Sequence, residues 1–424
     1  MQLAPGLFIL ERCMPTHEIQ PGQVNLAAIR EAAERIQSTI YETPFVYSET
    51  LSGLAGNSIF LKLENLQMTG SFKEWGALNR ILQLSKEEQS NGVIAASAGN
   101  HGQAVAWHAK RRGIAAEVWM PLHTPLIKVS ATRANGATVV LHGLNYDETA
   151  SAAQAKCAET GATWLHPFDD SAVIAGQGTI GLELLRQQPN LDAIVVPIGG
   201  GGLAAGVACA IKESGSGAEV IGVQTARVPS MKAALENGGL VTVEAGITLA
   251  DGIAVRRAGK LTFPLVRKYV DRIVTVDEEA IGAAILLLLE REKTLAEGAG
   301  ACGLAAVLQG TTGLRGKNVG VVISGGNLDV TLLSRIIERG LLRDGRRLRL
   351  RVRLPDHPGA LERLSRVIAH VGANIVETHH TRDHSGLAIG ETAIDVTMET
   401  RGRDHLEQIL QSLREAAYEF NVVD

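Results

Sequence analysis

The sequence lacks the long hydrophobic runs of membrane proteins. No apolar stretch in its 424 residues approaches the roughly 20 that a membrane-spanning helix needs. The apolar stretch 7–10 is too short for the core of a secretory signal peptide, and Glu11 and Arg12 follow it directly. We therefore expect neither a membrane anchor nor a secretory leader.

Cysteine is scarce, and neither sign of charge dominates. The four cysteines form no C-x-x-C pair and no Cys/His metal-ligand spacing; they are Cys13, Cys157, Cys209 and Cys302. This pattern predicts small buried apolar residues in a reducing compartment, so we expect a cytoplasmic protein. The formal net charge of −4 provides no basic field for nucleic acid or an anionic membrane.

Aromatic residues make up only 4% of the chain, whereas glycine is abundant, with 46 residues. The glycines follow no G-X-Y repeat and proline is not enriched, which excludes collagen and low-complexity disorder. A chain of this length is expected to fold into two or three domains, at roughly 100–200 residues each.

The body of the chain predicts an α/β fold. Residues 1–24 carry three prolines without periodicity and predict a loose arm, and the spacing of apolar residues over 26–36 predicts a helix. Beyond residue 59, helical stretches such as 72–84 and 103–111 alternate with short apolar runs typical of parallel strands buried on both faces. The predicted strands lie within 59–64, 92–97, 115–121, 137–143, 162–167, 193–200, 219–224 and 318–326. Functional groups should then lie at the carboxyl ends of these strands.

The pattern changes near residue 346 and predicts a separate small domain. Residues 346–355 alternate arginine with apolar residues, and the segments that follow give the order β-α-β-β-α-β of a ferredoxin-like fold. The period of two places the arginines on one solvated or edge-protecting strand face, which we favour over a nucleic-acid site. The predicted domains are thus an arm over 1–24, a body over 25–340 with a smaller subdomain at about 65–165, and a tail domain over 346–424.

A glycine-rich turn is the strongest chemical motif. It follows the strand at 193–197, opens a helix, and consists of Gly199, Gly200, Gly201, Gly202 and Leu203. Backbone N–H groups at a helix N-terminus bind phosphate well, so we favour a phosphate site over a bare turn. The spacing also fits a dinucleotide fingerprint, but the next strand closes on Gln224 instead of the acidic residue that such a site uses for the ribose.

Three more glycine-flanked turns lie at predicted strand ends, at 70–73, 97–102 and 324–327. The first ends on Lys73 at a helix start, where the helix dipole lowers the pKa of an amine and suits it to Schiff-base chemistry. The second offers small residues and side-chain donors for a carboxylate, although a simple helix cap by Ser97 or Asn100 fits equally well. The third brings the hydroxyl of Ser324. Four such turns fit one shared site better than four unrelated ones.

Six motifs, in order GSFK, SAGNHG, AGQGTIGLE, GGGGL, TLADGIAV and VISGGN, resemble the pyridoxal-phosphate enzymes of fold type II. Within that group the sequence is similar to the threonine ammonia-lyases and to the related serine dehydratases and racemases. The tail segment 356–361 resembles the D-x-P-G-x-L signature of ACT domains. The resemblance implies a carbon–nitrogen lyase that eliminates water from L-threonine, with serine as a second substrate, and that yields 2-oxobutanoate and ammonia.

The resemblance also implies roles for individual residues. Lys73 would attach pyridoxal 5'-phosphate and act as the catalytic base, with Phe72 packed on the ring. Asn100 would bind the ring 3-oxygen, Ser324 the ring nitrogen, and the main chain of 199–203 the phosphate. The substrate carboxylate would be held by the turn of Ser97, Ala98, Gly99, Asn100 and His101.

The tail implies regulation and assembly. ACT domains of such enzymes pair and bind a small amino acid, so the resemblance implies isoleucine as a feedback inhibitor, valine as an opposing effector, and a homo-oligomer, dimer or tetramer.

Several positions depart from the family pattern. Glu74 and Trp75 replace an apolar residue and an arginine after the lysine, and Ala98 replaces the serine that serves racemases as a second acid/base. Residues 224–227 supply no carboxylate for the cation site of some relatives, so no metal is expected. On the predicted strand, His379 and His380 should point to opposite faces, one to the core and one to water, rather than bind a metal. The alternatives are a lyase for serine or hydroxyaspartate, a racemase, or a non-catalytic amino-acid sensor.

Overall fold

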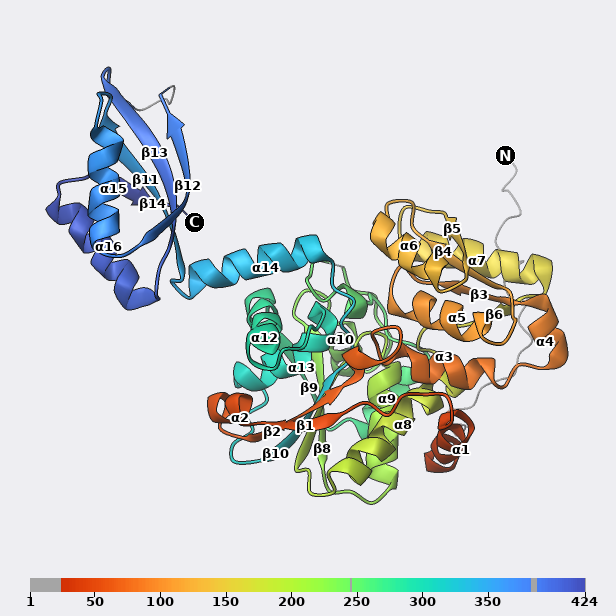
Figure 1. Cartoon of the computed structure of the whole chain (residues 1–424). Helices are drawn as coiled ribbons and strands as arrows, with labels where there is room; N and C mark the ends of the chain where they lie inside the picture. Colours follow the sequence, from red (N-terminus) through yellow and green to blue (C-terminus); the bar gives the residue numbers. More distant parts are fainter. Residues whose placement is uncertain (1–23, 245, 383–386, 424) are drawn as a thin grey trace, which may run out of the picture. The chain divides into compact units, whose positions relative to one another are not determined.

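The structure, a computed structural model, describes residues 24–244, 246–382 and 387–423 (Figure 1). It divides into two compact units, Met1–Asp329 and Val330–Asp424. The predicted arm lies outside the described residues apart from Val24, which is buried. Among the described residues, no helix is both long and apolar enough to cross a bilayer.

The first unit contains a six-stranded sheet in the order β1-β2-β10-β7-β8-β9. Its strands are β1 (Phe45–Ser48), β2 (Ser58–Leu63), β7 (Ala193–Pro197), β8 (Glu219–Thr225), β9 (Arg272–Val276) and β10 (Asn318–Ile323). All pairs are parallel except β1 with β2. In the part β2-β10-β7-β8, strands that are far apart in the sequence lie side by side. Because these strands are parallel, their carboxyl ends lie at one edge of the sheet.

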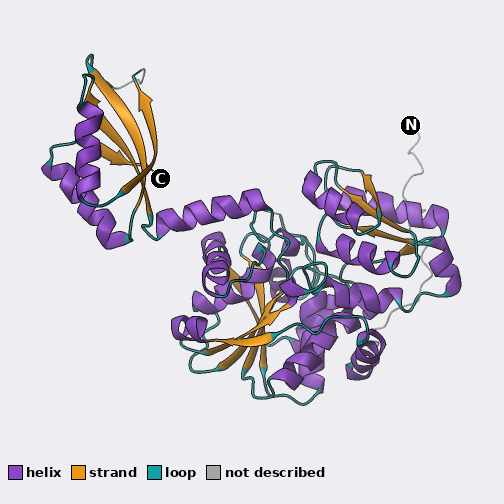
Figure 2. Ribbon diagram, viewed as in Figure 1, coloured by secondary structure: helices purple, strands orange, loops and turns teal. Residues whose placement is uncertain are grey.

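Helices cover both faces of this sheet (Figure 2). They are α1 (Leu26–Ile36), α2 (Glu49–Ala55), α8 (Ser171–Gln187), α9 (Gly202–Glu213), α10 (Ser230–Asn237), α11 (Thr262–Tyr269), α12 (Glu278–Arg291) and α13 (Gly298–Leu308), with short 3₁₀ turns η2 (Glu64–Leu66) and η3 (Asp251–Ile253). Side chains alternate along β7: Ile194 and Val196 join the core under α8 and α9, whereas Val195 faces the Gly303 side of α13. Because these strands are buried on both faces, their sequences are nearly continuous runs of apolar residues.

A second, smaller sheet has the order β5-β4-β3-β6 and is wholly parallel. Its strands are β3 (Val93–Ala96), β4 (Ala116–Met120), β5 (Thr138–Leu141) and β6 (Thr163–Trp164). The helices around it are α3 (Lys73–Ile81), α4 (Lys86–Asn91), α5 (Asn100–Lys110), α6 (Leu126–Ala134) and α7 (Tyr146–Thr160). It has its own core, in which Ile81 and Leu84 pack against strand residues such as Val118.

The predicted strands and the 26–36 helix are confirmed, and the differences are local. The helix predicted to begin at residue 103 begins at Asn100. Strands β1 and β9 were not predicted, because each lies at a sheet edge and is only partly buried, so neither carries a continuous apolar run.

The second unit holds the predicted β-α-β-β-α-β order. After α14 (Val330–Arg343) come β11 (Arg347–Pro355), α15 (Ala360–His370), β12 (Asn374–Thr381), β13 (Glu391–Glu399), α16 (Arg403–Glu415) and β14 (Phe420–Val422). They form an antiparallel sheet in the order β12-β13-β11-β14. Apolar residues of β11 such as Leu350 and Val352 pack on Leu364 and Ile409 of the helices.

One expectation for this unit is confirmed and one is wrong. The arginines of β11 share one partly exposed face, as expected. Because β11 is internal they protect no edge, and they pair with acids, as Arg351 does with Asp395 at 2.6 Å. His379 and His380 are both exposed, because β12 is the outermost strand and its residues around them face solvent on both sides.

Candidate active site

Three of the four glycine-flanked turns are joined by hydrogen bonds, and the fourth, 199–202, follows β7 beside β10 at the same carboxyl edge of the large sheet. The backbone N–H of Phe72 donates to the Ser324 carbonyl at 3.0 Å, and that of Gly326 to the Gly70 carbonyl at 2.9 Å. Ser71 and Gly325 form an antiparallel bridge. The turn that carries the lysine is therefore fastened to the turn after β10, as one shared site requires.

Lys73 begins α3 and is partly buried, and its amine donates to the Pro167 carbonyl at 2.7 Å. Burial lowers the pKa of this amine from 10.5 to about 8, while the negative charge of Glu297 opposes that change. The direction agrees with the expectation from the helix dipole, but burial is the main cause. The amine also lies 5.1 Å from the centroid of the Phe72 ring.

Asn100 is the first residue of α5 and does not cap it; the cap position belongs to Gly99. Its side chain turns to the other motifs instead. Asn100 Nδ2 donates to Glu297 Oε1 at 2.7 Å, and Asn327 Nδ2 donates to Asn100 Oδ1 at 2.7 Å. The second and fourth motifs are thus joined through Asn100.

The remaining residues of the 97–101 turn offer mainly backbone groups. The Ser97 hydroxyl accepts from the Gly99 N–H at 3.2 Å, and Ala98 is partly buried against the small core. The His101 ring is buried with Nε2 at 2.9 Å from the Leu165 carbonyl, and burial lowers its pKa to about 3. His101 is therefore neutral, and its backbone N–H at the helix N-terminus is what it presents for a carboxylate.

The glycine loop joins β7 to α9 as predicted, and side chains larger than hydrogen do not fit there. A Cβ at Gly200 would lie 2.4 Å from the Phe168 ring, and one at Gly202 would lie 2.7 Å from Gln177 Oε1. Gly201 has φ of 102°, a conformation that other residues rarely adopt. Within the described part of the chain, the backbone N–H groups of 199–201 donate to no other residue. Together with the first turn of α9 at Leu203, this is a cradle of unpaired donors that fits a phosphate.

Residues that the sequence did not single out hold this cradle in place. The Thr262 hydroxyl donates to the Gly200 carbonyl at 2.5 Å. The Asp169 carboxylate accepts from the N–H groups of Lys260 and Leu261, both at 2.8 Å, at the start of α11. No local signal marks Thr262, because its partner lies 62 residues away.

Glu297 is a second residue missed by sequence reasoning. Its side chain is buried beside Asn100, and burial raises the pKa of its carboxyl to about 7, with Asp251 adding to the rise and Asn100 opposing it. One acidic residue before the helix GAGACGLAAVL is a weak pattern, and it does not say which turn the carboxyl meets.

Glu74 and Trp75, the departure after the lysine, point away from the substrate turn into the interior. The indole N–H of Trp75 donates to Glu64 Oε2 at 2.6 Å. Glu74 accepts from the Thr69 N–H, and its other oxygen lies 3.1 Å from His108 Nε2. These side chains therefore hold the turn that carries Lys73 in place through Thr69, Glu64 and His108.

Gln224, in the segment 224–227 that corresponds to the cation site of some relatives, makes hydrogen bonds within the protein. Gln224 donates to the Ile198 carbonyl and accepts from the Lys232 N–H. Among residues 24–244, 246–382 and 387–423, no three His, Cys, Asp or Glu residues cluster in a way that could hold a metal.

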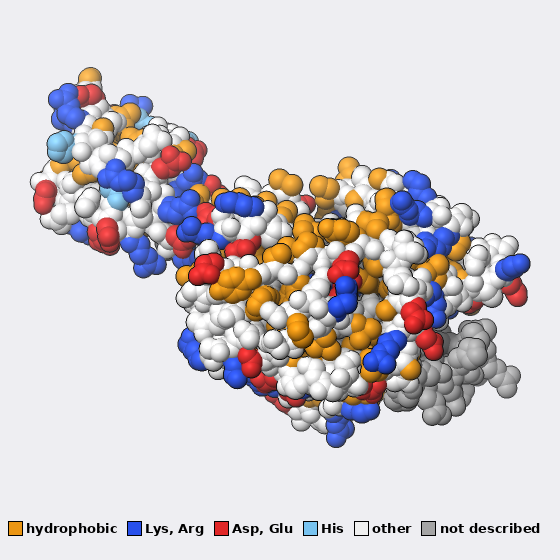
Figure 3. All heavy atoms as spheres, turned by 60° about the horizontal axis from the view of Figure 1, so that its bottom comes forward, with side chains coloured by type: hydrophobic (Ala, Val, Ile, Leu, Met, Phe, Trp, Pro, Cys, Tyr) orange, Lys and Arg blue, Asp and Glu red, His pale blue; other side chains and the backbone are white. Residues whose placement is uncertain are grey.

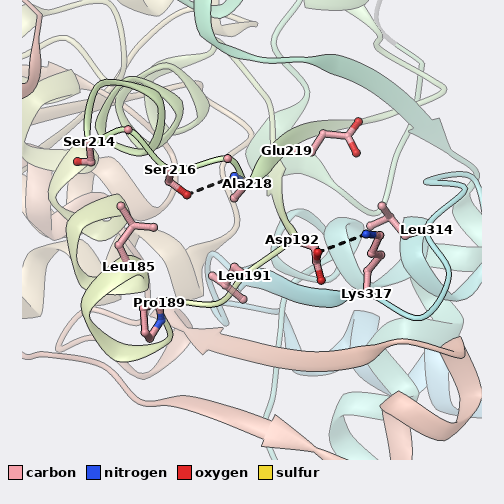
Figure 4. A pocket seen from close by; sticks show the side chains of 12 residues that line it. Leu185, Pro189, Leu191, Asp192, Ser214, Ser216, Ala218, Glu219, Leu314 and Lys317 are labelled. Atoms are coloured by element: carbon pink, nitrogen blue, oxygen red, sulfur yellow. Dashed lines mark hydrogen bonds and ion pairs between the residues drawn. The ribbon is translucent and has the colours of Figure 1, made fainter.

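A pocket of about 650 Å³ lies at the opposite edge of the sheet, where β7, β8 and β10 begin (Figure 4). Its charged side chains are already paired, Asp192 with Lys317 at 3.3 Å and Glu219 with Arg272 at 2.5 Å. None of the predicted site residues lines it. The motif residues, and not this pocket, define the candidate active site.

The sequence and structure of this chain are similar to those of known proteins. The model of the pyridoxal-phosphate dependent enzyme family matches residues 36–325, and that of the ACT domain matches residues 348–417. The chain is 48% identical over 400 residues to an L-threonine ammonia-lyase of Thermotoga maritima, covering 94% of this chain and all of the other. A threonine deaminase structure from Solanum lycopersicum is 37% identical with a TM-score of 0.71, covering 75% of this chain and 87% of that one. A serine racemase structure from Dictyostelium discoideum is 38% identical with a TM-score of 0.68, covering 73% of this chain and 100% of that one.

Proposed function

The chain belongs to the pyridoxal-phosphate dependent enzymes and carries an ACT domain, and from this premise we propose that it is a threonine ammonia-lyase regulated by an amino acid. L-threonine loses water across Cα and Cβ, and the resulting enamine takes up water to give 2-oxobutanoate and ammonia. The observation that carries this proposal is the Lys73 amine at the start of α3, in a turn that is hydrogen-bonded to the Ser324 turn.

Different residues of this chain bind the cofactor, move the proton and hold the substrate. Pyridoxal phosphate, when bound, supplies the electron sink that makes the substrate Cα proton acidic. Lys73 attaches the cofactor and, once its amine is free, accepts the Cα proton at Nζ. Its lowered pKa makes the neutral, proton-accepting form more abundant than it is for an ordinary lysine. The 199–203 backbone holds the phosphate, Ser324 meets the ring nitrogen, and the 97–101 turn holds the substrate carboxylate.

A steady-state assay with L-threonine tests the proposal. We expect formation of 2-oxobutanoate that Lys73→Ala abolishes, while Lys268→Ala, a lysine on α11 outside the site, retains it. A full-length protein that binds pyridoxal phosphate but does not turn over threonine would contradict the proposal and favour an amino-acid sensor.

Substrate preference follows from the 97–101 turn. Ala98 carries no group that can move a proton, so we propose proton transfer on one face of the substrate, with elimination and little racemisation. L-serine should react as a second substrate. Comparing kcat/KM for threonine, serine and hydroxyaspartate separates the candidates, and equal or better turnover of hydroxyaspartate would contradict the threonine assignment.

The ACT domain is the proposed site of regulation. A cavity of about 540 Å³ lies beside the loop 354–362, and Arg382 and Asp356 pair at its edge at 3.2 Å. An amino acid bound there would exchange this pair for contacts of its carboxylate with Arg382 and of its ammonium group with Asp356. We propose isoleucine as feedback inhibitor and valine as the opposing effector, with a coupling free energy of about 1–3 kcal/mol. If isoleucine changes neither activity nor assembly state, this assignment is wrong.

We propose a cytoplasmic homo-oligomer, dimer or tetramer. The cysteines that are described are unpaired thiols, as expected in a reducing compartment. Hydrophobic side chains gather on one face of the catalytic unit (Figure 3). Two segments of this unit carry most of the large exposed apolar residues. The first, 41–68, includes the edge strand β1 and contributes Tyr41, Val46, Tyr47, Leu54, Leu66 and Met68. The second, 122–146, contributes Leu122, Leu126, Ile127, Leu141, Leu144 and Tyr146. Such a patch is typical of a subunit interface, and light scattering of the purified protein measures the subunit number.

A further inference from the structure

Both ends of the Asn100 amide are bound by protein groups. Its Oδ1 accepts from Asn327 Nδ2 at 2.7 Å, and one N–H of its Nδ2 donates to Glu297 Oε1 at 2.7 Å. A primary amide has two N–H groups. In the part of the chain that the structure describes, the second N–H of Asn100 donates to no residue.

These contacts determine which way the amide faces. Asn327 Nδ2 also donates to the Thr69 carbonyl at 2.7 Å, and a backbone carbonyl can only accept, so the Asn327 amide has one possible orientation. If the Asn100 amide turned over, its NH₂ would face the NH₂ of Asn327 and its oxygen would face the Glu297 carboxyl. Both contacts would then be repulsive.

We propose that Glu297 and Asn327 form a clamp that locks the Asn100 amide, so that its second N–H serves as the donor to the ring 3-oxygen of pyridoxal phosphate. Glu297 is thereby a positioning residue that acts through Asn100. The inference rests on the proposed function, because it takes for Asn100 the role toward the cofactor that the family resemblance implies.

The surroundings of Glu297 are built for this contact. Its own N–H donates to the Gly325 carbonyl at 3.0 Å, which fixes the start of α13 to the turn after β10. The neighbouring glycines leave room for the carboxyl: a Cβ at Gly325 would lie 2.5 Å from Oε1 and one at Gly252 would lie 3.4 Å away. No bulkier residue at position 325 would leave Oε1 in reach of Asn100.

The charged groups around Glu297 give the clamp a pH dependence. Burial and Asp251 raise the pKa of the carboxyl to about 7, while Asn100, Lys128 and Lys73 act in the opposite direction. Above that pH the carboxylate is the stronger acceptor for the Asn100 N–H, whereas below it a neutral carbonyl oxygen accepts more weakly. The Asn100 amide is accordingly held most firmly in the range where the Lys73 amine is neutral.

The test compares Glu297→Ala, Glu297→Gln, Asn327→Ala and Asn100→Ala in the full-length enzyme. Two quantities are measured: the dissociation constant of pyridoxal phosphate, and the midpoint of the pH-dependent change in visible absorbance of the bound cofactor. Glu297→Ala and Asn327→Ala should each weaken binding about tenfold, the loss of one charge-assisted or fixed hydrogen bond. Both should also move the absorbance midpoint to higher pH, because the 3-oxygen loses a donor and becomes the better proton acceptor.

Two further comparisons separate positioning from a structural role. Glu297→Gln keeps an acceptor oxygen and should restore most of the affinity lost in Glu297→Ala. The double variant Asn100→Ala/Glu297→Ala should match Asn100→Ala alone, because residues that act through one another are not additive. Glu183→Gln is the matched control. It removes another carboxyl whose pKa burial raises to about 7, but one that pairs with Lys62 instead of Asn100, and it should change neither quantity.

Several outcomes would overturn the clamp. One is a Glu297→Ala variant with lowered thermal stability but unchanged affinity and midpoint, and another is full additivity with Asn100→Ala. If Glu297→Ala does not fold, Asn327→Ala carries the same expectation. If Asn100→Ala itself leaves both quantities unchanged, the clamp fails while threonine turnover and its loss in Lys73→Ala still stand, so the proposed function is judged separately.

Discussion

The buried Lys73 amine predicts how fast the cofactor-free enzyme takes up pyridoxal phosphate at each pH. Only the neutral amine attacks the cofactor carbonyl, so the uptake rate follows the fraction of Lys73 that has lost its proton. Burial lowers the pKa of this amine from 10.5 to about 8 because the ammonium form loses its hydration.

The size of the effect follows from that difference. Below pH 8 the neutral fraction of Lys73 should exceed that of an ordinary lysine by about 300-fold, the antilogarithm of roughly 2.5 pH units. The uptake rate should rise tenfold per pH unit below 8 and level off above it. An ordinary lysine would continue to rise to about pH 10.4.

Stopped-flow absorbance after mixing cofactor-free enzyme with pyridoxal phosphate measures this rate between about pH 7 and 10, above the second phosphate pKa near 6. A free lysine derivative, treated in the same way, is the control and should show no plateau. Glu297→Gln should move the midpoint below 8, because the carboxylate favours the ammonium form of Lys73. A rate that still climbs tenfold per unit at pH 9.5 would refute the reasoning, since it would mean that Lys73 is hydrated.

Three further predictions concern positions around the site. Gly200→Ala should weaken pyridoxal phosphate binding by about tenfold or more, because the new methyl would lie 2.4 Å from the Phe168 ring. The control Gly53→Ala should bind the cofactor normally, because a Cβ there meets nothing within 4 Å. Equal affinities of the two variants in a binding titration would contradict this prediction. Trp75→Phe should lower the free energy of unfolding, measured in urea, by about 1–3 kcal/mol, because the buried carboxylate of Glu64 loses the indole N–H that donates to it. A changed preference for threonine over serine in this variant would show that Trp75 acts on the substrate. Ala98→Ser should raise formation of D-allothreonine from L-threonine, or of D-serine from L-serine, because a hydroxyl returns to the position that racemases use. Chiral chromatography detects these products, and an unchanged product ratio would place the second acid elsewhere.

The local pattern of the sequence was enough for most of the fold. The helix at 26–36 and all eight predicted strands form, because periodicity and β-branched runs act over a few residues. Strands β1 and β9 were not predicted, because an edge strand with half-exposed residues has no continuous run of apolar residues. The exposure of both His379 and His380 was missed for a related reason: strand position within the sheet, and not alternation, decided it.

The chemistry divides in the same way. Lys73 and the turn 199–202 were recognisable because a phosphate cradle and a helix-start lysine are built from consecutive residues. Glu297 and Thr262 were not, because their partners lie 197 and 62 residues away. The pKa of Lys73 is lowered, as its place at a helix start predicts, but burial, which the sequence does not reveal, is the main cause.

By itself, the sequence determined the order of strands and helices, the turns rich in glycine, and the presence of a lysine suited to hold a carbonyl cofactor. Only the tertiary structure decided that β10 lies between β2 and β7, which brings Ser324 to the lysine turn and Glu297 to Asn100. The reason is physical. Backbone preferences act between neighbours in the chain, whereas burial, amide orientation and the pKa of a buried amine depend on groups that folding brings together from distant segments.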